Sequence, residues 1–172
     1  FSRILGKHGH ARHYHVAAEE IKHAIAEHLY NKERGAFLKM LRWDKGQLIP
    51  DPTLDASALF GLLEFQVFAP TDHRIESMIK LVAQTLFNKS PAGGLPRYEN
   101  DAYFRAGPNA PPNPWFITTL WLAHYYIHNA QTADDFTPVL KIFQWVAAHA
   151  TPEGLLAEQV NALTGAPLSV TP

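Results

Sequence analysis

The chain has 172 residues, of which 47% are hydrophobic and 18% are charged, and its formal net charge is −1. This composition is typical of one globular domain with a core of its own. The charge balance provides no basic surface for a phosphate backbone, no apolar run approaches the roughly 20 residues of a membrane span, and the absence of cysteine excludes disulfides and thiolate metal sites. We therefore expect neither a nucleic-acid nor a membrane partner.

The first 50 residues predict one helix and one excursion in extended conformation. Apolar residues recur at three- and four-residue spacing over 14–30, which is typical of an amphipathic helix. The following segment, in which Gly35 and Gly46 bracket several large apolar residues, predicts a short β-hairpin or extended excursion.

Two further helices are predicted before the middle of the chain. The segment 53–68 is mostly apolar and indicates a buried helix that ends before Pro70, and the segment 71–87 has a regular apolar face and gives the clearest helix signal. The candidate N-cap residues are Thr53 and Asp55 for the first helix and Thr71 and Asp72 for the second.

The second half of the chain combines a long loop with two strongly apolar helices. The segment from Asn88 to Pro112 is rich in Gly, Pro and Asn, and loops of this length that persist in compact domains are often functional. Helices are predicted from Asn113 to Asn129, with Pro114 in the first turn, and from Asp134 to His149. Both are apolar nearly all round, which is typical of helices buried on several sides.

These elements predict an all-α domain over residues 1–172. The two apolar helices fit the inner ring of a helical barrel better than a small bundle. About five helices with so much apolar surface are not expected to enclose themselves fully. We therefore expect an incomplete barrel, with self-association through its exposed half-barrel faces or a partner chain that covers them.

The long loop concentrates aromatic and charged side chains. Within nine positions it holds Arg97, Tyr98, Glu99, Asp101, Tyr103 and Arg105, and Asn113 and Trp115 follow. Aromatic rings cover the apolar faces of sugars, and arginine and carboxylate groups bond to paired hydroxyls, so this set favours a sugar site. An Arg–Asp ion pair with tyrosines that pin the loop to the core explains the same residues.

A lone carboxylate, Glu158, lies in a loop or short turn near the end of the chain. Pro152 and Gly154 precede it, and Gly165 and Pro167 follow it. Its apolar flanks predict a place where water is scarce. The local sequence is compatible with a general base, a helix-capping carboxylate or a solvated side chain.

Histidines near the start of the chain raise the question of a metal site. The cluster comprises His8, His10, His13 and His15. A zinc site needs three or four converging ligands with supporting partners, and this cluster lies where chains are least ordered. We therefore expect no metal ion. The sequence also has no Ser/His/Asp set at a familiar spacing and no glycine-rich phosphate loop that follows a strand.

Taken in order, five segments of the chain resemble glycoside hydrolase family 15, the glucoamylase, glucodextranase and trehalase-like enzymes. Three segments carry the main resemblance: "GGLPRYENDAYF", "NPWFITTLWLAHYYI" and "GLLAEQVNALTGAPLSV". Two earlier segments, "IKHAIAEHLYNKERGAFLKML" and "DPTLDASALFGLLEF", extend it over nearly the whole chain. The resemblance implies part of an (α/α)6 barrel of the six-hairpin glycosidase type, corresponding to the C-terminal half of the catalytic domain.

The resemblance also implies roles for particular residues. Glu158 of the "EQ" pair corresponds to the general base that activates water in an inverting, cofactor-free hydrolysis. The expected sugar-binding residues are Arg97, Tyr98, Asp101, Tyr103 and Trp115. The implied parent is an exo-acting α-glucosidase that takes an oligosaccharide or disaccharide substrate.

Two departures from the family pattern limit the expected activity. Asn161 stands where members often have Asp, and the family's general acid lies in a "WEE"-like segment that this sequence lacks, since Trp43–Asp44 has a different context. We expect the chain alone to be inactive. A family-15 trehalase and a non-catalytic, glycan-binding barrel of the phosphorylase kinase subunit type remain as alternatives, and the lack of cysteine and of a signal peptide is compatible with the cytoplasm.

Overall fold

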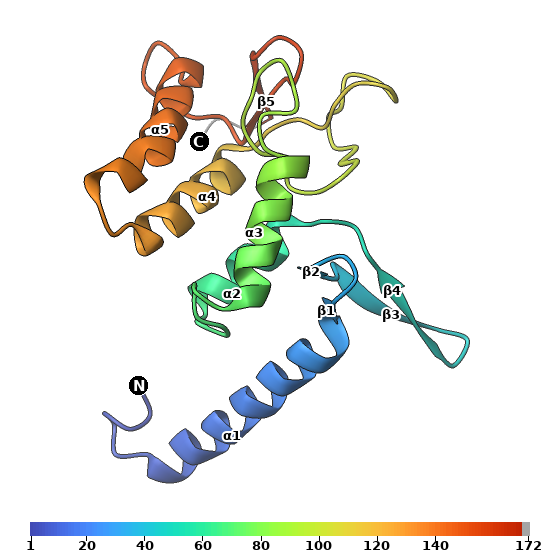
Figure 1. Ribbon diagram of the computed structural model, residues 1–172, viewed down its shortest axis with the longest axis vertical. Coiled ribbons are helices and arrows are strands. Elements are labelled where there is room, and N and C mark those ends of the chain that lie inside the picture. The colour runs from blue at the N-terminus through green and yellow to red at the C-terminus, as the bar shows by residue number, and fades with distance from the viewer. Residues whose placement is uncertain (170–172) are drawn as a thin grey trace.

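The computed structural model describes residues 1–169, which form five α-helices with irregular connections between them (Figure 1). The helices are α1 (His8–Ala24), α2 (Ala56–Glu64), α3 (His73–Thr85), α4 (Phe116–Asn129) and α5 (Thr137–His149). A π-helical turn over Ile25–Leu29 continues α1, and a 3-10 turn over Ala133–Phe136 precedes α5. Among residues 1–169, no helix has both the length and the apolar character needed to cross a bilayer.

Three antiparallel strand pairs accompany the helices. They are β1 (Tyr30–Asn31) with β2 (Ala36–Phe37), β3 (Met40–Asp44) with β4 (Gln47–Asp51), and β5 (Gln159–Val160) with β6 (Pro167–Leu168). The β3–β4 pair is the predicted hairpin, although its turn lies at Lys45 and Gly46, which both have positive φ as such turns require. The other two pairs have two residues per strand and were not predicted.

Two of the predicted helices end or begin elsewhere in the structure. α1 begins at His8 rather than Tyr14. α2 stops at Glu64, well before Pro70, because the chain turns through a left-handed residue at Gln66, whose φ is 52°. At the N-termini, two of the four candidate caps are confirmed: the carboxylate of Asp55 accepts backbone N–H groups of α2, and that of Asp72 accepts one from α3.

The start of α4 corrects a prediction that matters for the site. The helix begins at Phe116 rather than Asn113, and Trp115 is its extended N-cap residue. Pro114 therefore lies before the helix and not in its first turn. Trp115 is extended and forms bridges to Leu95 and Gln159.

The core lies where α2, α3 and α4 pack together with β2 on one side and α5 on the other. Its fully buried members include Leu54, Ile75, Met78, Val82, Leu95 and Ile142. Burial of each such side chain contributes about 1.5–3 kcal/mol. The expectation that both apolar helices are buried on several sides holds only partly: α5 buries Val139 and Ile142, whereas Leu140 and Phe143 on the same helix are exposed.

α1 has no buried residue and reaches the rest of the fold only through its C-terminal end (Figure 1). Its apolar stripe is open to solvent: Tyr14 is 59% exposed and Ile21 is 60% exposed. Isolated helices of this length are marginal in water, and packing within the described residues gives α1 little support. The helices of the described residues do not close a ring (Figure 1).

Candidate functional site

A small row of paired residues joins three distant parts of the chain, the last of which is the β5–β6 pair. Leu95 bridges to Trp115, Trp115 to Gln159, and Gln159 pairs with Leu168 across β5 and β6. We call this arrangement the site sheet. Trp115 donates its backbone N–H to Leu95, and Phe116 donates to the carbonyl of Glu158, at 3.0 and 3.2 Å. The long loop and the Glu158 segment thus lie at the same end of the fold, at the start of α4 (Figure 1).

The close approach of the long loop to the helices requires glycine at position 94. Gly94 has φ of +71°, and a Cβ there would lie 2.6 Å from Cζ2 of Trp145 and 2.8 Å from Cβ of Pro114. Real Cβ atoms do not approach neighbours so closely, and only glycine adopts this φ without strain. The backbone can therefore pass between α5 and the start of α4, and this path places Leu95 and Arg97 at the site.

Arg97 and Asp101 form a two-pronged ion pair at the centre of the site. Arg97 donates from Nε to Oδ2 of Asp101 at 2.7 Å and from Nη2 to Oδ1 at 2.8 Å. Oδ1 also accepts the backbone N–H of Tyr103 at 3.1 Å. Asp101 is buried, whereas the Arg97 side chain is 30% exposed.

The protonation states of this pair are fixed by their contact. Burial acts to raise the pKa of Asp101, but the hydrogen bonds from Arg97 and from the Tyr103 backbone outweigh it, and the pKa lies below its ordinary value. The hydrogen bonds with the Asp101 carboxylate raise the pKa of Arg97. The guanidinium is therefore charged, and Asp101 accepts from its Nε and Nη2 groups but not from Nη1.

Aromatic rings surround the guanidinium. The Arg97 Cζ atom lies 4.3 Å from the Trp115 ring centre, 5.2 Å from that of Tyr103 and 5.4 Å from that of Tyr98. Tyr103 is 45% exposed, while Trp115 is buried. One face of Tyr98 is covered by Lys39, whose Nζ lies 3.2 Å from the ring centre, so Tyr98 lies at the edge of the cluster.

Asn113 connects the two loops of the site. Its Nδ2 donates to the carbonyls of Tyr103 and Phe104, at 3.3 and 2.9 Å, and its Oδ1 accepts the N–H of Ala162 at 3.0 Å. This buried amide uses all its main hydrogen-bonding groups. The loop that carries Asp101 and the loop that carries Glu158 are thereby fastened to each other.

The backbone of Glu158 lies next to the start of α4, but the surroundings of its side chain differ from those expected. Its carbonyl is held by Phe116, while its side chain is exposed and accepts a hydrogen bond from the hydroxyl of Ser169. The neighbours Ala157 and Gln159 are buried, because successive residues of an extended segment point to opposite sides. The expectation that Glu158 lies where water is scarce is therefore wrong. Among residues 1–169, Glu158 also forms no ion pair.

The other carboxylates near the site are already bound. Glu99 accepts from Arg34 and from the backbone N–H of Leu54, at 2.6 and 2.7 Å. Asp55 caps α2 and lies 3.4 Å from Nζ of Lys39. Together with Asp101, these groups are structural anions. Glu158 differs from them in being accessible to solvent.

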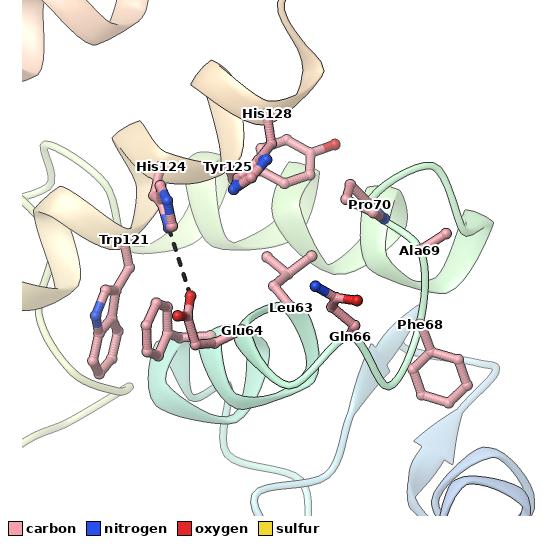
Figure 2. Close-up of a pocket in the computed structure, with 11 residues that line it drawn as sticks. Leu63, Glu64, Gln66, Phe68, Ala69, Pro70, Trp121, His124, Tyr125 and His128 are labelled. Carbon is pink, nitrogen blue, oxygen red and sulfur yellow. Dashed lines mark ion pairs between the residues drawn. The ribbon is translucent and has the colours of Figure 1, made fainter. Parts of the chain in front are cut away.

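A cavity that the sequence reasoning missed lies elsewhere in the fold. It has a volume of about 670 Å³ and lies between the end of α2, the following loop and the second half of α4 (Figure 2). Phe60 and Trp121 stack beside it with ring centres 4.1 Å apart, and Glu64 lies 3.8 Å from His124. None of the six predicted site residues lines it. The spacing of His124 and His128, four apart on one helix, was the available signal.

The amino-terminal histidines lie on α1 and are all exposed. Within residues 1–169, no group of three or more His, Cys, Asp or Glu side chains is arranged to hold a metal ion.

The fold of this chain is shared with chains of glycosidases. It superposes on a bacterial glucoamylase in complex with acarbose with a TM-score of 0.74 and 21% identity, over 99% of this chain and 28% of that one. It also superposes on a wild-type glycosidase with a TM-score of 0.64 and 21% identity, over 87% and 34% of the two chains. A sialidase matches with a TM-score of 0.70 and 16% identity, over 95% of this chain and 15% of the sialidase.

Sequence comparison adds one relative. A protein of Methanocaldococcus jannaschii, described as an uncharacterized glycosyl hydrolase, is 28% identical over 99% of this chain. The chain spans about a quarter of the length of that relative, 27%. No protein-family model matches the chain. The comparisons thus relate the chain to glycosidases, and its helices are those of a glucoamylase-like fold.

Proposed function

We propose that this chain forms part of an inverting, exo-acting α-glucosidase of the glucoamylase type, in glycoside hydrolase family 15. In this proposal Glu158 is the general base that activates water. Arg97, Tyr98, Asp101, Tyr103 and Trp115 form one side of the sugar pocket. No cofactor is used.

The observation that supports the proposal best is the contrast between Glu158 and the carboxylates around it. Asp55, Glu99 and Asp101 are bound to cations or backbone N–H groups, whereas the Glu158 side chain is exposed and, among residues 1–169, is held by one hydroxyl alone. A general base must be able to reach water, and a carboxylate that is tied to arginine is a poor proton acceptor. Glu158 is therefore the carboxylate of this site best suited to the task.

The Arg97 cluster supports the sugar-binding part of the proposal. A guanidinium held rigidly by Asp101 above the Trp115 ring has N–H groups left to donate, and rigid donors lose little entropy when they bind hydroxyls. Tyr103 adds a half-exposed ring beside it. This combination of aromatic faces and a fixed cation suits a pyranose.

An inverting mechanism needs a second carboxyl group, about 6.5–9.5 Å from the base, to protonate the leaving oxygen. We assign no such acid among the described residues, since the nearby carboxylates are already engaged. The proposal therefore requires a general acid from outside this chain, and this requirement is part of what an experiment tests.

The test measures hydrolysis by the full-length protein with maltose, dextrin, isomaltose and trehalose, and follows the anomer of the released glucose by NMR. We expect glucose of inverted configuration from the α-glucosides. Glu158→Gln should lower turnover by about a hundred- to ten-thousand-fold, because it removes general base assistance, while the affinity for acarbose changes little.

A matched control is Glu153→Gln, which alters an exposed glutamate in the same loop that makes no hydrogen bond in the described part of the chain. Turnover of that variant should equal that of the wild type. Turnover of the Glu158 variant within a few-fold of the wild type would refute the base assignment. Preferred cleavage of trehalose would identify the trehalase alternative, and sugar binding without hydrolysis would identify a non-catalytic barrel.

A further inference from the structure

Lys39 lies between β2 and β3 and reaches across the fold to the residues around Arg97. Its backbone is held on both sides, because Leu38 donates to the carbonyl of Leu29 at 2.8 Å and Lys39 donates to that of Asp51 at 3.0 Å. Its side chain is only 22% exposed, and lysines are rarely so buried unless they are paired. The fold thus brings one ammonium group from a distant segment to the edge of the candidate site.

This ammonium group contacts two partners at once. Its Nζ lies 3.4 Å from Oδ2 of Asp55 and 3.2 Å from the ring centre of Tyr98. Asp55 is buried, and its other oxygen, Oδ1, accepts the N–H groups of Ser57 and Ala58 in the first turn of α2. The position of the ammonium group is therefore tied to the N-terminus of α2, and one face of Tyr98 has a cation in direct contact.

The backbone of Tyr98 is fixed independently of this contact. Tyr98 forms an antiparallel bridge with Asp55, and Ala56 donates to the carbonyl of Arg97 at 2.8 Å. These bonds leave the torsions of the Tyr98 side chain unspecified. The ring is half-buried and meets two cations, the Lys39 ammonium at 3.2 Å and the Arg97 guanidinium at 5.4 Å. The nearer cation is the group best placed to set the orientation of the ring.

We propose that Lys39 is a positioning residue, which holds the Tyr98 ring beside Arg97 and so raises the affinity of the site for its sugar. This inference rests on the proposed function, in which Tyr98 is one of the sugar-binding residues. Lys39 covers one face of the ring and pairs with Asp55, so it acts through Tyr98 and not on the sugar directly. Burial raises the pKa of Tyr98, so its phenol is neutral at pH 7 and keeps an O–H group to donate to a sugar hydroxyl.

The physical advantage is that a ring already held in place loses little conformational entropy when the sugar binds. The cost of ordering one such side chain corresponds to about two- to tenfold in affinity. Because this cost is the same for the substrate and for the transition state, losing the contact should raise KM and leave kcat nearly unchanged.

The test measures maltose hydrolysis and calorimetric binding of acarbose with the full-length protein. Lys39→Met keeps a long stem and removes the ammonium group, and we expect KM to rise and acarbose affinity to fall by about three- to tenfold, with kcat within about twofold of the wild type. Lys39→Gln carries no cation for the ring and should show the same loss. Lys39→Arg keeps a cation that pairs with carboxylates and stacks on rings, so it should restore both values to within about twofold.

Arg34→Met is the matched control. Arg34 is 30% exposed and pairs with Glu99, the residue after Tyr98, at 2.6 Å. The variant therefore removes a similarly placed cation and leaves the contact between Lys39 and the Tyr98 ring in place. Its melting temperature should fall, while KM and acarbose affinity stay within about twofold of the wild type.

A double-mutant cycle separates positioning of the ring from a general structural role. Tyr98→Leu removes the ring, and in that background Lys39→Met should have no further effect on KM or acarbose affinity, because no ring is left to position. Equal losses in both backgrounds, or a wild-type KM in Lys39→Met, would overturn the inference alone. A wild-type protein that neither binds acarbose nor hydrolyses maltose would overturn the proposed function, and this inference with it.

Discussion

The Arg97–Asp101 pair allows a quantitative test of how the site is built. Asp101→Asn removes the charge of a buried carboxylate that accepts three hydrogen bonds, two from Arg97 and one from the backbone N–H of Tyr103. The new amide has one oxygen to accept with, and its NH₂ group faces the guanidinium donors. The variant therefore keeps at most part of the set and leaves Arg97 without a counter-charge.

The size of the effect follows from these contacts. Hydrogen bonds to charged groups contribute roughly 1.5–3 kcal/mol each, and water can replace part of the loss because Arg97 is 30% exposed. We expect the free energy of unfolding to fall by about 2–3 kcal/mol, which corresponds to a melting temperature lower by about 5–10 °C for a domain of this size. Affinity for acarbose should fall about tenfold, because the guanidinium is no longer held over Trp115.

The assay combines urea unfolding, followed by circular dichroism, with calorimetric titration of acarbose. Asp72→Asn is the matched control, since Asp72 holds Arg74 by an equivalent pair of bonds, of 2.9 and 2.7 Å, at the start of α3. It should lose stability and keep sugar affinity. A change in unfolding free energy below about 0.5 kcal/mol for Asp101→Asn, or an equal loss of affinity in both variants, would refute the reasoning.

Two further predictions concern acid stability and the open helix faces. The Arg74 guanidinium lowers the pKa of Asp72 to about 2, so this pair stabilises the fold above pH 4, and its contribution is lost as the pH falls through about 2. Urea unfolding between pH 5 and 2 should show this loss of stability. In Asp72→Asn the free energy of unfolding should depend less on pH over this range. The open stripe of α1 should drive self-association of the 172-residue chain, which light scattering detects and Tyr14→Lys together with Ile21→Lys should weaken. A compact monomer of the unmodified chain that binds no apolar dye would contradict the second prediction.

The sequence predicted the elements whose signals are local. α3 has a regular apolar face formed by Ile75, Met78, Ile79 and Val82, and a capping aspartate directly before it, so its position followed from periodicity. The helical class followed in the same way. Boundaries near Pro114 and Gln66 were less predictable, because tertiary bridges and a left-handed turn decided them.

The site shows a different limit. The Arg97–Asp101 ion pair joins residues four positions apart and was predicted as one of two readings of this segment, while the sugar contact stays a prediction. The site sheet was not predictable, because its members come from three distant segments and its strands have too few residues to show alternation. The same alternation explains the error at Glu158: apolar neighbours in an extended segment point inward when the residue between them points outward.

The three hydrogen bonds of Asn113 have a consequence for motion. Because one rigid amide holds both Tyr103–Phe104 and Ala162, neither loop can shift far without straining the other. Ordering of the Tyr103 loop by any molecule would be transmitted to the backbone next to Glu158, so the two halves of this surface are mechanically coupled and respond in concert.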